Sequence, residues 1–336
     1  MRVVVVGAGL AGLCAAGDLR DAGHEVVVLD KGTGPGGRMA TRRIGGATVD
    51  HGAQFFTVRT DRIARAVEQW RAEGLVREWS RGFGPTPDGY PRYAVVGGMN
   101  ALAKHLAHGT DVRSRSLAFA IRRAPTSARV PAWQVVVDSG EVHPADAVVV
   151  ATPVPQALAL TIMAEVTLPD ALRTIDYDRT LALLAVLDRA PAIPEPGAVQ
   201  NGDPTFSMIV DNVRKGVSAI PAVTAHASAE VSLARWDDDR AATNRALLGA
   251  LEPWFGGANV VDSQVKRWRL ATPQSTWPEP CWTAPDAPGA LVLAGDAFAG
   301  PQVAGPKIEA AITSGWAAAS AVLARAGTAR SGTAGA

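Results

Sequence analysis

The N-terminal segment Met1–Asp30 constrains the fold more than any other part of the chain. Val3–Val6 is a short apolar, β-branched run, which is the pattern of a strand buried on both faces. Residues 7–12, GAGLAG, follow it and fit GxGxxG, and an Ala- and Leu-rich segment with helical character continues to about Ala22. A second apolar run, Glu25–Leu29, ends at Asp30, an acid about twenty residues beyond the glycines. This βαβ unit predicts a Rossmann-type site for a dinucleotide.

Each position of the glycine motif has a physical role in such a site. Gly7 allows the tight turn, Gly9 lets the backbone approach a pyrophosphate, and Gly12 allows close helix–strand packing. Ala11 is assigned to the same cradle, where the amides at the helix N-terminus attract phosphates. Asp30 would accept hydrogen bonds from a ribose. The alternative is a glycine-rich turn in an ordinary α/β domain, but the flanking strands, helix and acid favour the dinucleotide site.

Composition narrows the protein class without indicating the reaction. The 336 residues suffice for one large or two intimate domains, and the formal net charge of +1 favours neither nucleic acid nor an anionic membrane as partner. No apolar run reaches the roughly 18 residues of a membrane-spanning helix. Cys14 and Cys281 are the two cysteines, too few for a disulfide framework or a metal cluster, so no metal is expected. We expect a cytoplasmic protein whose oligomeric state the sequence does not fix.

A second glycine-rich loop follows Asp30 and changes the expected cofactor. Residues 31–39, KGTGPGGRM, carry five glycines or prolines between Gly32 and Arg38. Lys31, Gly37 and Arg38 are assigned to the cofactor, and the planar guanidinium of Arg38 suits a second contact with a diphosphate. A nicotinamide Rossmann domain does not need such a loop, whereas a flavin domain does, so FAD is expected. Residues 50–56, DHGAQFF, then supply Gln54 and Phe55 as further cofactor candidates.

Several motifs together resemble a known family. GAGLAG, GGRMATRR at residues 36–43 and DHGAQFFT at residues 50–57 resemble the FAD-dependent amine oxidase superfamily, and within it renalase and its bacterial relatives. The resemblance extends to residues 96–107, 111–112, 133–137, 146–153, 291–296 and 307–315. It implies an α/β fold with a Rossmann-like FAD-binding domain of the GR2 type. It also implies that the backbone near Val112 meets the adenine.

The last of these motifs supports a flavin site from its residue types as well. Residues 291–294 predict a buried strand, and Asp296 follows it, where open α/β sheets bind ligands. Asp296 could hold ribityl hydroxyls, the alternative being a turn or helix cap. A helix is expected from about Lys307 to Leu323, with Pro306 suited to its first turn. Its first amides, near Ile308, could stabilise negative charge on a reduced flavin.

The resemblance and the remaining patterns predict an interleaved domain organisation. The expected FAD-binding domain comprises residues 1–56, 94–155 and 265–325, an α+β substrate domain with an antiparallel sheet comprises residues 57–93 and 156–264, and residues 326–336 form a disordered tail. A helix is expected over Trp236–Glu252, with Asp237–Asp239 in its first turn as helix-start acids rather than metal ligands.

Five side chains are candidates for the substrate side. Arg43 could face a phosphate, as could Arg42, with surface salt bridges as the alternative. Gln54 could hydrogen-bond the flavin or substrate. Trp268 and Trp282 could frame a planar substrate, although either could equally be a core anchor. The surroundings of Cys281 do not fit a covalent flavin link, so non-covalent FAD is expected.

The resemblance implies a dihydronicotinamide substrate, an isomer of reduced NAD(P) whose hydride passes to the flavin. The products would be NAD(P)+ and, with oxygen as the partner that reoxidises the flavin, hydrogen peroxide. No catalytic base is required, and no side chain is assigned as one. The alternatives are an amine oxidase acting on a small amine or polyamine, a flavin-dependent desaturase or isomerase, and a non-catalytic FAD-binding protein.

Overall fold

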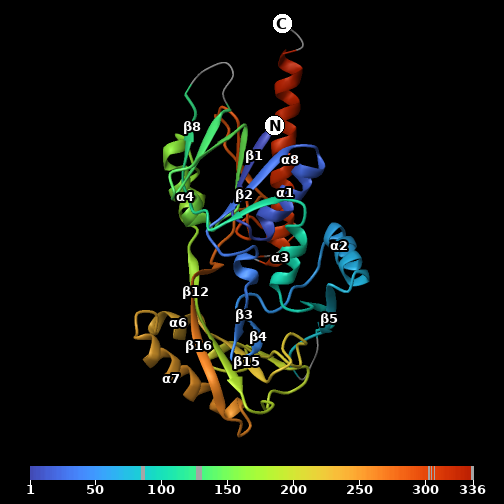
Figure 1. The fold of residues 1–336 in the computed structure, drawn as a ribbon, viewed down its shortest axis with the longest axis vertical. Coiled ribbons are helices and arrows are strands. Elements are labelled where there is room, and N and C mark those ends of the chain that lie inside the picture. The colour runs from blue at the N-terminus through green and yellow to red at the C-terminus, as the bar shows by residue number, and fades with distance from the viewer. Residues whose placement is uncertain (85–87, 126–130, 302, 304, 306, 334–336) are drawn as a thin grey trace. The chain divides into compact units, whose positions relative to one another are not determined.

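The computed structural model describes residues 1–84, 88–125, 131–301, 303, 305 and 307–333, with side chains described as far as residue 326. It forms two compact units, each assembled from separate stretches of the chain (Figure 1). Unit 1 comprises Met1–Gly37, Ala103–Asp176 and Pro273–Ala336, and unit 2 comprises Arg38–Leu102 and Tyr177–Thr272. The division into a cofactor domain and a substrate domain stays a prediction.

Unit 1 is built on a six-stranded sheet, whose order is β17 (Trp282–Thr283), β18 (Ala290–Leu293), β11 (Ala147–Val150), β1 (Arg2–Val6), β2 (Glu25–Asp30) and β7 (Asp111–Ser114). All neighbouring pairs are parallel except β17–β18. The central strands are valine-rich and buried on both faces, as their continuous apolar runs predict. The Rossmann-like α/β architecture is therefore confirmed.

Two helices of unit 1 pack closely beside this sheet. α1 (Leu10–Asp21) contacts α8 (Ile308–Thr333), and a Cβ built on Gly315 would lie 2.2 Å from the carbonyl oxygen of Ala11. α8 runs well beyond the expected end near Leu323 and covers residues 326–333, for which a disordered tail was predicted. Pro306 lies outside the described residues.

The remaining elements of unit 1 form a smaller layer. They are the antiparallel sheet of β10 (Val142–Ala145), β9 (Trp133–Val137) and β8 (Ala118–Arg123), with α4 (Val154–Thr161), η2 (Ile162–Ala164) and α5 (Asp170–Arg173). α3 (Asn100–Leu106) contains the point at which the chain passes from unit 2 back to unit 1.

Unit 2 is built on a five-stranded sheet, whose order is β13 (Ala198–Gln200), β14 (Phe206–Asp211), β15 (Ala222–Ala227), β12 (Tyr177–Leu187) and β16 (Val260–Pro273). The pairs β13–β14, β14–β15 and β12–β15 are antiparallel, which confirms the predicted antiparallel sheet. Alternate residues of β12 serve two cores. Leu181 and Leu183 face a cluster with Leu247 and Leu251 of α7 (Arg240–Leu251). Leu184 and Val186 face a hairpin on the other side of the sheet.

That hairpin, β3 (Thr41–Ile44) and β4 (Ala47–Asp50), places the residues that follow the glycine loop against the sheet. Ala47 and Val49 are fully buried there, and a Cβ on the turn residue Gly45 would lie 3.2 Å from the Cβ of Asp262 in β16. The other elements of unit 2 are η1 (Gly37–Met39), α2 (Asp61–Ala72), the hairpin of β5 (Val76–Ser80) and β6 (Arg92–Val95), α6 (Ala229–Ala234) and η3 (Glu252–Trp254).

α7 begins later than its sequence pattern predicts. It starts at Arg240 instead of Trp236, because Asp239 is the N-cap and its carboxylate accepts the backbone N–H groups of Ala241 and Ala242. Asp237 and Asp238 therefore precede the helix. The described residues contain no group of side chains placed to bind a metal ion, and no helix long and apolar enough to cross a bilayer.

Candidate functional site

The glycine motif of unit 1 forms a cradle that only glycine fits at two positions. Gly7 follows β1 with φ +107°, and a Cβ there would lie 2.9 Å from the carbonyl oxygen of Ala151. A Cβ on Gly12 would lie 1.9 Å from the carbonyl oxygen of Gly7. Gly9 differs, because no described atom lies within 4 Å of the position of its Cβ. Gly9 is also the N-cap of α1 and has no side chain to cap the helix, so the first amides of α1 suit a phosphate.

Asp30 links the two glycine loops. Its Oδ2 accepts the N–H of Ala8 at 2.7 Å, and its Oδ1 accepts the N–H of Gly32 at 2.6 Å. The N–H of Gly36 donates to the carbonyl of Ala8 at 2.8 Å, and a Cβ on Gly37 would lie 3.5 Å from the Cα of Gly9. The sequence suggested only a ribose contact for this carboxylate. In the structure it also holds both loops, and the cradle that results fits the diphosphate of FAD.

The other predicted cofactor residues of unit 1 follow or flank the same sheet. Gly7, Asp30 and Gly295 come at or just beyond the carboxyl ends of β1, β2 and β18, which are parallel and so end at one edge. Asp296 comes next to Gly295, whose N–H donates to Ser314 Oγ at 2.9 Å.

Three further cofactor candidates of unit 1 lie in β7, at the start of α8 and in the loop after β2. Val112, in β7, pairs with Val28 of β2. Ile308 is the first residue of α8, and Lys31 is exposed in the loop after β2. Ala11 is buried in α1.

The predicted cofactor residues of unit 2 form hydrogen bonds and ring contacts with other residues of the protein. Arg38 Nη1 donates to the carbonyl of Ala271 at 2.8 Å, and its guanidinium lies 5.8 Å from the ring centre of Tyr177. The ring of Phe55 packs edge-on against Phe83 at 5.0 Å. Gln54 is 5% exposed. Its amide nitrogen donates to the carbonyls of residues 50 and 52, so its polar atoms hold the chain in place.

One of these residues, Gln54, contacts a buried ion pair that the sequence did not indicate. Lys215 Nζ lies 2.8 Å from Asp50 Oδ2 and 3.0 Å from Gln54 Oε1, and both charged side chains are 0% exposed. Burial lowers the pKa of Lys215 from its usual value, while the carboxylate of Asp50 opposes that shift. Asp50 Oδ1 also accepts the N–H of Met99 at 2.8 Å and the hydroxyl of Thr41 at 2.5 Å.

Trp268 pairs with a histidine to which the sequence assigned no role. The rings of Trp268 and His51 stack with centres 5.3 Å apart, and Trp268 Nε1 donates to the carbonyl of His51 at 2.7 Å. Burial lowers the pKa of His51 to about 4, and Lys266 and Arg42 lower it further while Asp50 raises it. The imidazole is therefore neutral at pH 7. The pair presents a fixed, partly exposed aromatic surface in unit 2.

The other substrate-side candidates divide between the surface and the core. Ile44 packs against the sheet, so the alternation of β3 directs Arg42 to the side of the sheet and Arg43 away from it. Trp282 belongs to unit 1, where it is 7% exposed in β17 and pairs with Leu293. Its surroundings are those of a core residue.

Cys281 has the properties of an unreactive thiol. Its side chain is free of any disulfide, and burial, followed by Glu279, raises its pKa to about 11. The thiolate is the nucleophilic form, so Cys281 is a poor nucleophile at neutral pH.

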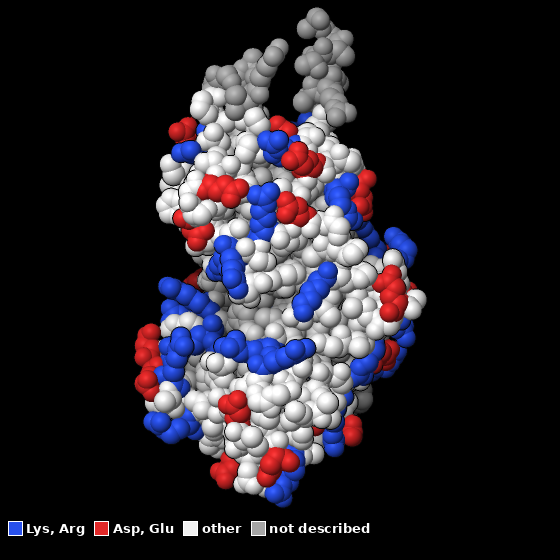
Figure 2. Space-filling view, viewed as in Figure 1, with Lys and Arg blue, Asp and Glu red and all other residues white. Residues whose placement is uncertain are grey.

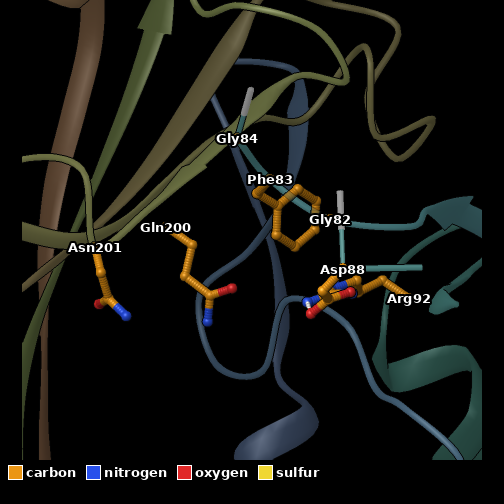
Figure 3. Close-up of a pocket in the computed structure, with 7 residues that line it drawn as sticks. All are labelled: Gly82, Phe83, Gly84, Asp88, Arg92, Gln200 and Asn201. Carbon is orange, nitrogen blue, oxygen red and sulfur yellow. Dashed lines mark hydrogen bonds and ion pairs between the residues drawn. The ribbon is translucent and has the colours of Figure 1, made fainter. Parts of the chain in front are cut away.

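A small pocket of about 200 Å³ lies elsewhere in unit 2 (Figure 3). The described residues that line it are Gly82, Phe83, Gly84, Asp88, Arg92, Gln200 and Asn201. Asp88 and Arg92 form an ion pair at its wall, and this pair lowers the pKa of Asp88 to about 2. The predicted site residues are not among these seven, although the ring of Phe55 packs against that of Phe83.

Comparisons with known proteins agree with this arrangement. The profile of the family described as flavin containing amine oxidoreductase matches residues 68–323, and that of the NAD(P)-binding Rossmann-like domain matches residues 5–70. Hydroxyneurosporene desaturase of Rubrivivax gelatinosus is 50% identical over 58 residues, which are 17% of this chain and 11% of that protein. A Mycobacterium tuberculosis protein named as flavin-containing monoamine oxidase AofH is 41% identical over 86 residues, 20% of this chain and 19% of that protein. The chain thus matches less than a fifth of each relative's length.

Solved structures share the fold across nearly the whole chain. Putrescine oxidase bound to putrescine superimposes with a TM-score of 0.72 at 16% identity, covering 97% of this chain and 100% of that one. An Exiguobacterium sp. 255-15 protein named for protoporphyrinogen oxidase gives a TM-score of 0.69 at 15% identity, covering 95% and 98%. At these identities the likeness shows the fold alone. The family profile spans most of the chain, and the chain therefore belongs to the flavin containing amine oxidoreductases.

Proposed function

We propose that this protein is a renalase-like, FAD-dependent oxidase of dihydronicotinamide nucleotides. It would take a hydride from an isomer of reduced NAD(P), release NAD(P)+ and pass the electrons to oxygen, giving hydrogen peroxide. FAD would be held non-covalently. The observation that carries the proposal is the positive charge around the Trp268–His51 pair.

The charge is visible in the groups that shift the pKa of His51. Beyond the effect of burial, Lys266 and Arg42 both lower the pKa of His51. Asp50, the carboxylate that raises this pKa, is itself paired with Lys215. Figure 2 shows Lys and Arg side chains forming a band over the region that β3 and β16 occupy in Figure 1. A positive surface repels the protonated amine that predominates at neutral pH and attracts an anionic nucleotide. It therefore favours the nucleotide as substrate.

The chain's own residues would bind and orient the reactants. The residues proposed to hold the cofactor are Gly7, Gly9, Ala11, Gly12, Asp30, Lys31, Gly37, Arg38, Gln54, Phe55, Val112, Asp296 and Ile308. Bound FAD would supply the acceptor for a hydride, that is, one proton with two electrons. Trp268, fixed by its hydrogen bond and by His51, offers a flat surface for a planar ring.

No side chain needs to remove a proton in this reaction. Loss of hydride converts a dihydropyridine directly into an aromatic pyridinium, so the substrate's electron pair leaves with its hydrogen. His51, neutral at pH 7, is not required as a base. Reduction of oxygen to hydrogen peroxide consumes the two electrons and two protons, one of which comes from the hydride. The protein's contribution is proximity and orientation.

An amine oxidase is the second candidate, because the comparisons include AofH and putrescine oxidase. Such an enzyme would need an environment that accepts a cation. The cations near His51 argue against this for unit 2. We also propose that the enzyme acts in the cytoplasm, where its two free cysteines would stay reduced.

Product stoichiometry tests the proposal. Holoenzyme mixed with isomeric reduced NAD in air should form one NAD+ and one hydrogen peroxide per donor consumed, measured by chromatography and a peroxidase-coupled assay. Putrescine and benzylamine should form none. Peroxide from the amines, with no NAD+ from the nucleotides, would establish the amine oxidase instead.

A further inference from the structure

We propose that Arg42, Lys266 and Arg240 form a phosphate-binding site in unit 2 that selects phosphate-bearing dihydronicotinamides over uncharged ones. The residues of this site belong to unit 2, whereas the phosphates of the cofactor are expected at the glycine cradle of unit 1. The identity of the substrate rests on the function proposed above, but the capacity to bind a phosphate does not.

Lys266 lies on the face of β16 that contacts the β3–β4 hairpin. Asp262, Lys266 and Trp268 are separated by even numbers of residues, so they project from one face of the strand. On that face Asp262 lies against the turn of the β3–β4 hairpin, near Gly45, and Trp268 lies against His51 just beyond the end of β4. Lys266 lies between these two contacts and therefore beside the hairpin.

Arg42 lies on the side of β3 that faces the sheet. The alternation of β3 turns Arg42 and Ile44 to the same side, and Ile44 packs against the sheet. Arg42 is therefore on the side of the hairpin nearest Lys266, whereas Arg43 is on the opposite side. Burial lowers the pKa of His51 most, and Lys266 and Arg42 lower it further, which agrees with a position of both cations near His51.

The third member comes from a different element. Arg240 is the first residue of α7, which packs on the face of β16 that carries Val265 and Arg267, where Arg267 Nη2 donates to the carbonyl of Asp238. Lys266 projects from the opposite face. Because β16 is the edge strand of the sheet, Arg240 can approach Lys266 around that edge. Partial burial lowers the pKa of Lys266 most, and Arg42 and then Arg240 lower it further. Three cations from β3, β16 and α7 thus converge.

These cations lack counter-charges. Within the described parts of the chain, none of Arg42, Lys266 and Arg240 has a carboxylate within 4.0 Å, whereas the nearby Arg235 pairs with Asp238 at 3.2 Å. Holding like charges together raises the free energy of the unliganded site, and a bound anion removes that cost. Arg42 and Arg240 are exposed and Lys266 is half-buried, so a ligand can reach them.

The donor set indicates the ligand. Two guanidinium groups offer planar, bidentate hydrogen bonding and the ammonium adds a compact charge, which together suit a phosphate or diphosphate. Trp268 lies two residues from Lys266 on the same face of β16, so the protein could bind the aromatic ring and the phosphate of one ligand side by side. We therefore assign this site to the phosphate groups of a nicotinamide nucleotide.

Binding of ADP-ribose to the holoenzyme tests the site without catalysis. Isothermal titration at low and high salt would compare the wild type with Arg42→Gln, Lys266→Gln and Arg240→Gln. Each change should weaken ADP-ribose binding about tenfold, since each removes one charge-assisted contact. Arg65→Gln, an exposed charge loss on α2, is the matched control and should bind as the wild type does.

A kinetic comparison identifies which phosphate is bound. The three variants should raise KM for isomeric reduced NAD about tenfold, leave the limiting rate of flavin reduction unchanged, and leave KM for dihydronicotinamide riboside unchanged. An equal effect with reduced nicotinamide mononucleotide would place its single phosphate at the site. An effect confined to the dinucleotides would place the diphosphate or the adenosine phosphate there.

The outcomes separate the two proposals. Unaltered ADP-ribose binding in all three correctly folded variants, judged by thermal unfolding and the flavin spectrum, would overturn the phosphate site whatever the substrate is. If the variants weaken ADP-ribose binding but no dihydronicotinamide reduces the flavin, the phosphate site would stand and the proposed function would be rejected. Lys266→Arg keeps the charge and should retain most of the affinity; if it binds as weakly as Lys266→Gln, charge is not the cause.

Discussion

The ammonium of Lys215 lies 2.8 Å from a carboxylate oxygen of Asp50, and neither side chain is exposed to solvent. The pair joins the end of β4 to the loop after β14, and Lys215 also holds the amide oxygen of Gln54. It therefore fixes both ends of the short segment that carries His51. A buried pair of this kind is costly to break, because removal of one partner leaves the other charge uncompensated.

Lys215→Met should destabilise the protein by about 3–5 kcal/mol, since it strands the carboxylate of Asp50 in the interior. Urea unfolding followed by circular dichroism would measure the loss. Lys104→Met, an exposed site, should change stability by less than about 0.5 kcal/mol. The double change Asp50→Leu and Lys215→Met should cost less than the sum of the single changes; strict additivity would show that the two charges do not interact.

Gly12→Ala should prevent FAD binding, because the added methyl would meet the carbonyl oxygen of Gly7 at 1.9 Å and force the cradle apart. The ratio of flavin to protein absorbance after purification is the readout. Gly17→Ala, in the same helix, meets no described atom within 4 Å and should retain full FAD while stabilising α1 slightly. Normal flavin content in Gly12→Ala would contradict the assignment of this motif as the cradle.

Stability should fall as the pH is lowered from 7 to 5. Burial lowers the pKa of both His51 and His226 to about 4, below the usual value of 6.5, so the unfolded chain takes up protons that the folded chain does not. The favourable contribution is complete above about pH 6.5 and is lost as the pH falls toward 4, by at most about 1.4 kcal/mol per pH unit for each imidazole. Urea unfolding at several pH values would measure the slope, and His226→Gln should roughly halve it. A slope that His226→Gln leaves unchanged would exclude this origin.

Trp268→Phe and Trp282→Phe should have different consequences. Trp268 is partly exposed beside His51, so its replacement should slow flavin reduction or raise KM about tenfold with little change in stability. Trp282 is buried in the strand β17, so its replacement should lower the melting temperature and leave KM unchanged. The reverse pattern would move the substrate to the unit that contains Trp282.

All flavin should be released when the protein is precipitated with acid. The pKa of Cys281 is raised to about 11, so its thiol is protonated and unreactive at neutral pH. Cys281→Ser should keep the same flavin content and spectrum. Yellow colour remaining with the pellet in the wild type and absent in Cys281→Ser would show a covalent link.

Local sequence patterns were sufficient to predict the parts of the fold that depend on neighbouring residues. The valine runs of β1, β2 and β11 and the spacing of Gly7 and Gly12 follow from periodicity and turn chemistry, and both are confirmed. The beginning of α7 was predicted too early, because an aspartate run contains no signal that says which carboxylate becomes the cap.

The long-range relationships could not be predicted in this way. Asp50 and Lys215 are 165 residues apart, and an Asp or Lys in a polar segment ordinarily indicates an exposed side chain. His51 and Trp268 meet only because the hairpin and β16 pack together, 217 residues apart in sequence. Arg42, and not Arg43, is assigned to the phosphate site because of which face of β3 meets the sheet. The sequence of a short strand with two adjacent arginines does not reveal that face.

Anaerobic stopped-flow mixing tests most directly whether the hydride donor is a dihydronicotinamide nucleotide. Holoenzyme would be mixed without oxygen with isomers of reduced NAD and NADP, with dihydronicotinamide riboside, and with putrescine, spermidine and benzylamine. We expect rapid bleaching of the flavin absorbance by the nucleotides and none by the amines. Bleaching by an amine with none by any nucleotide would contradict this expectation.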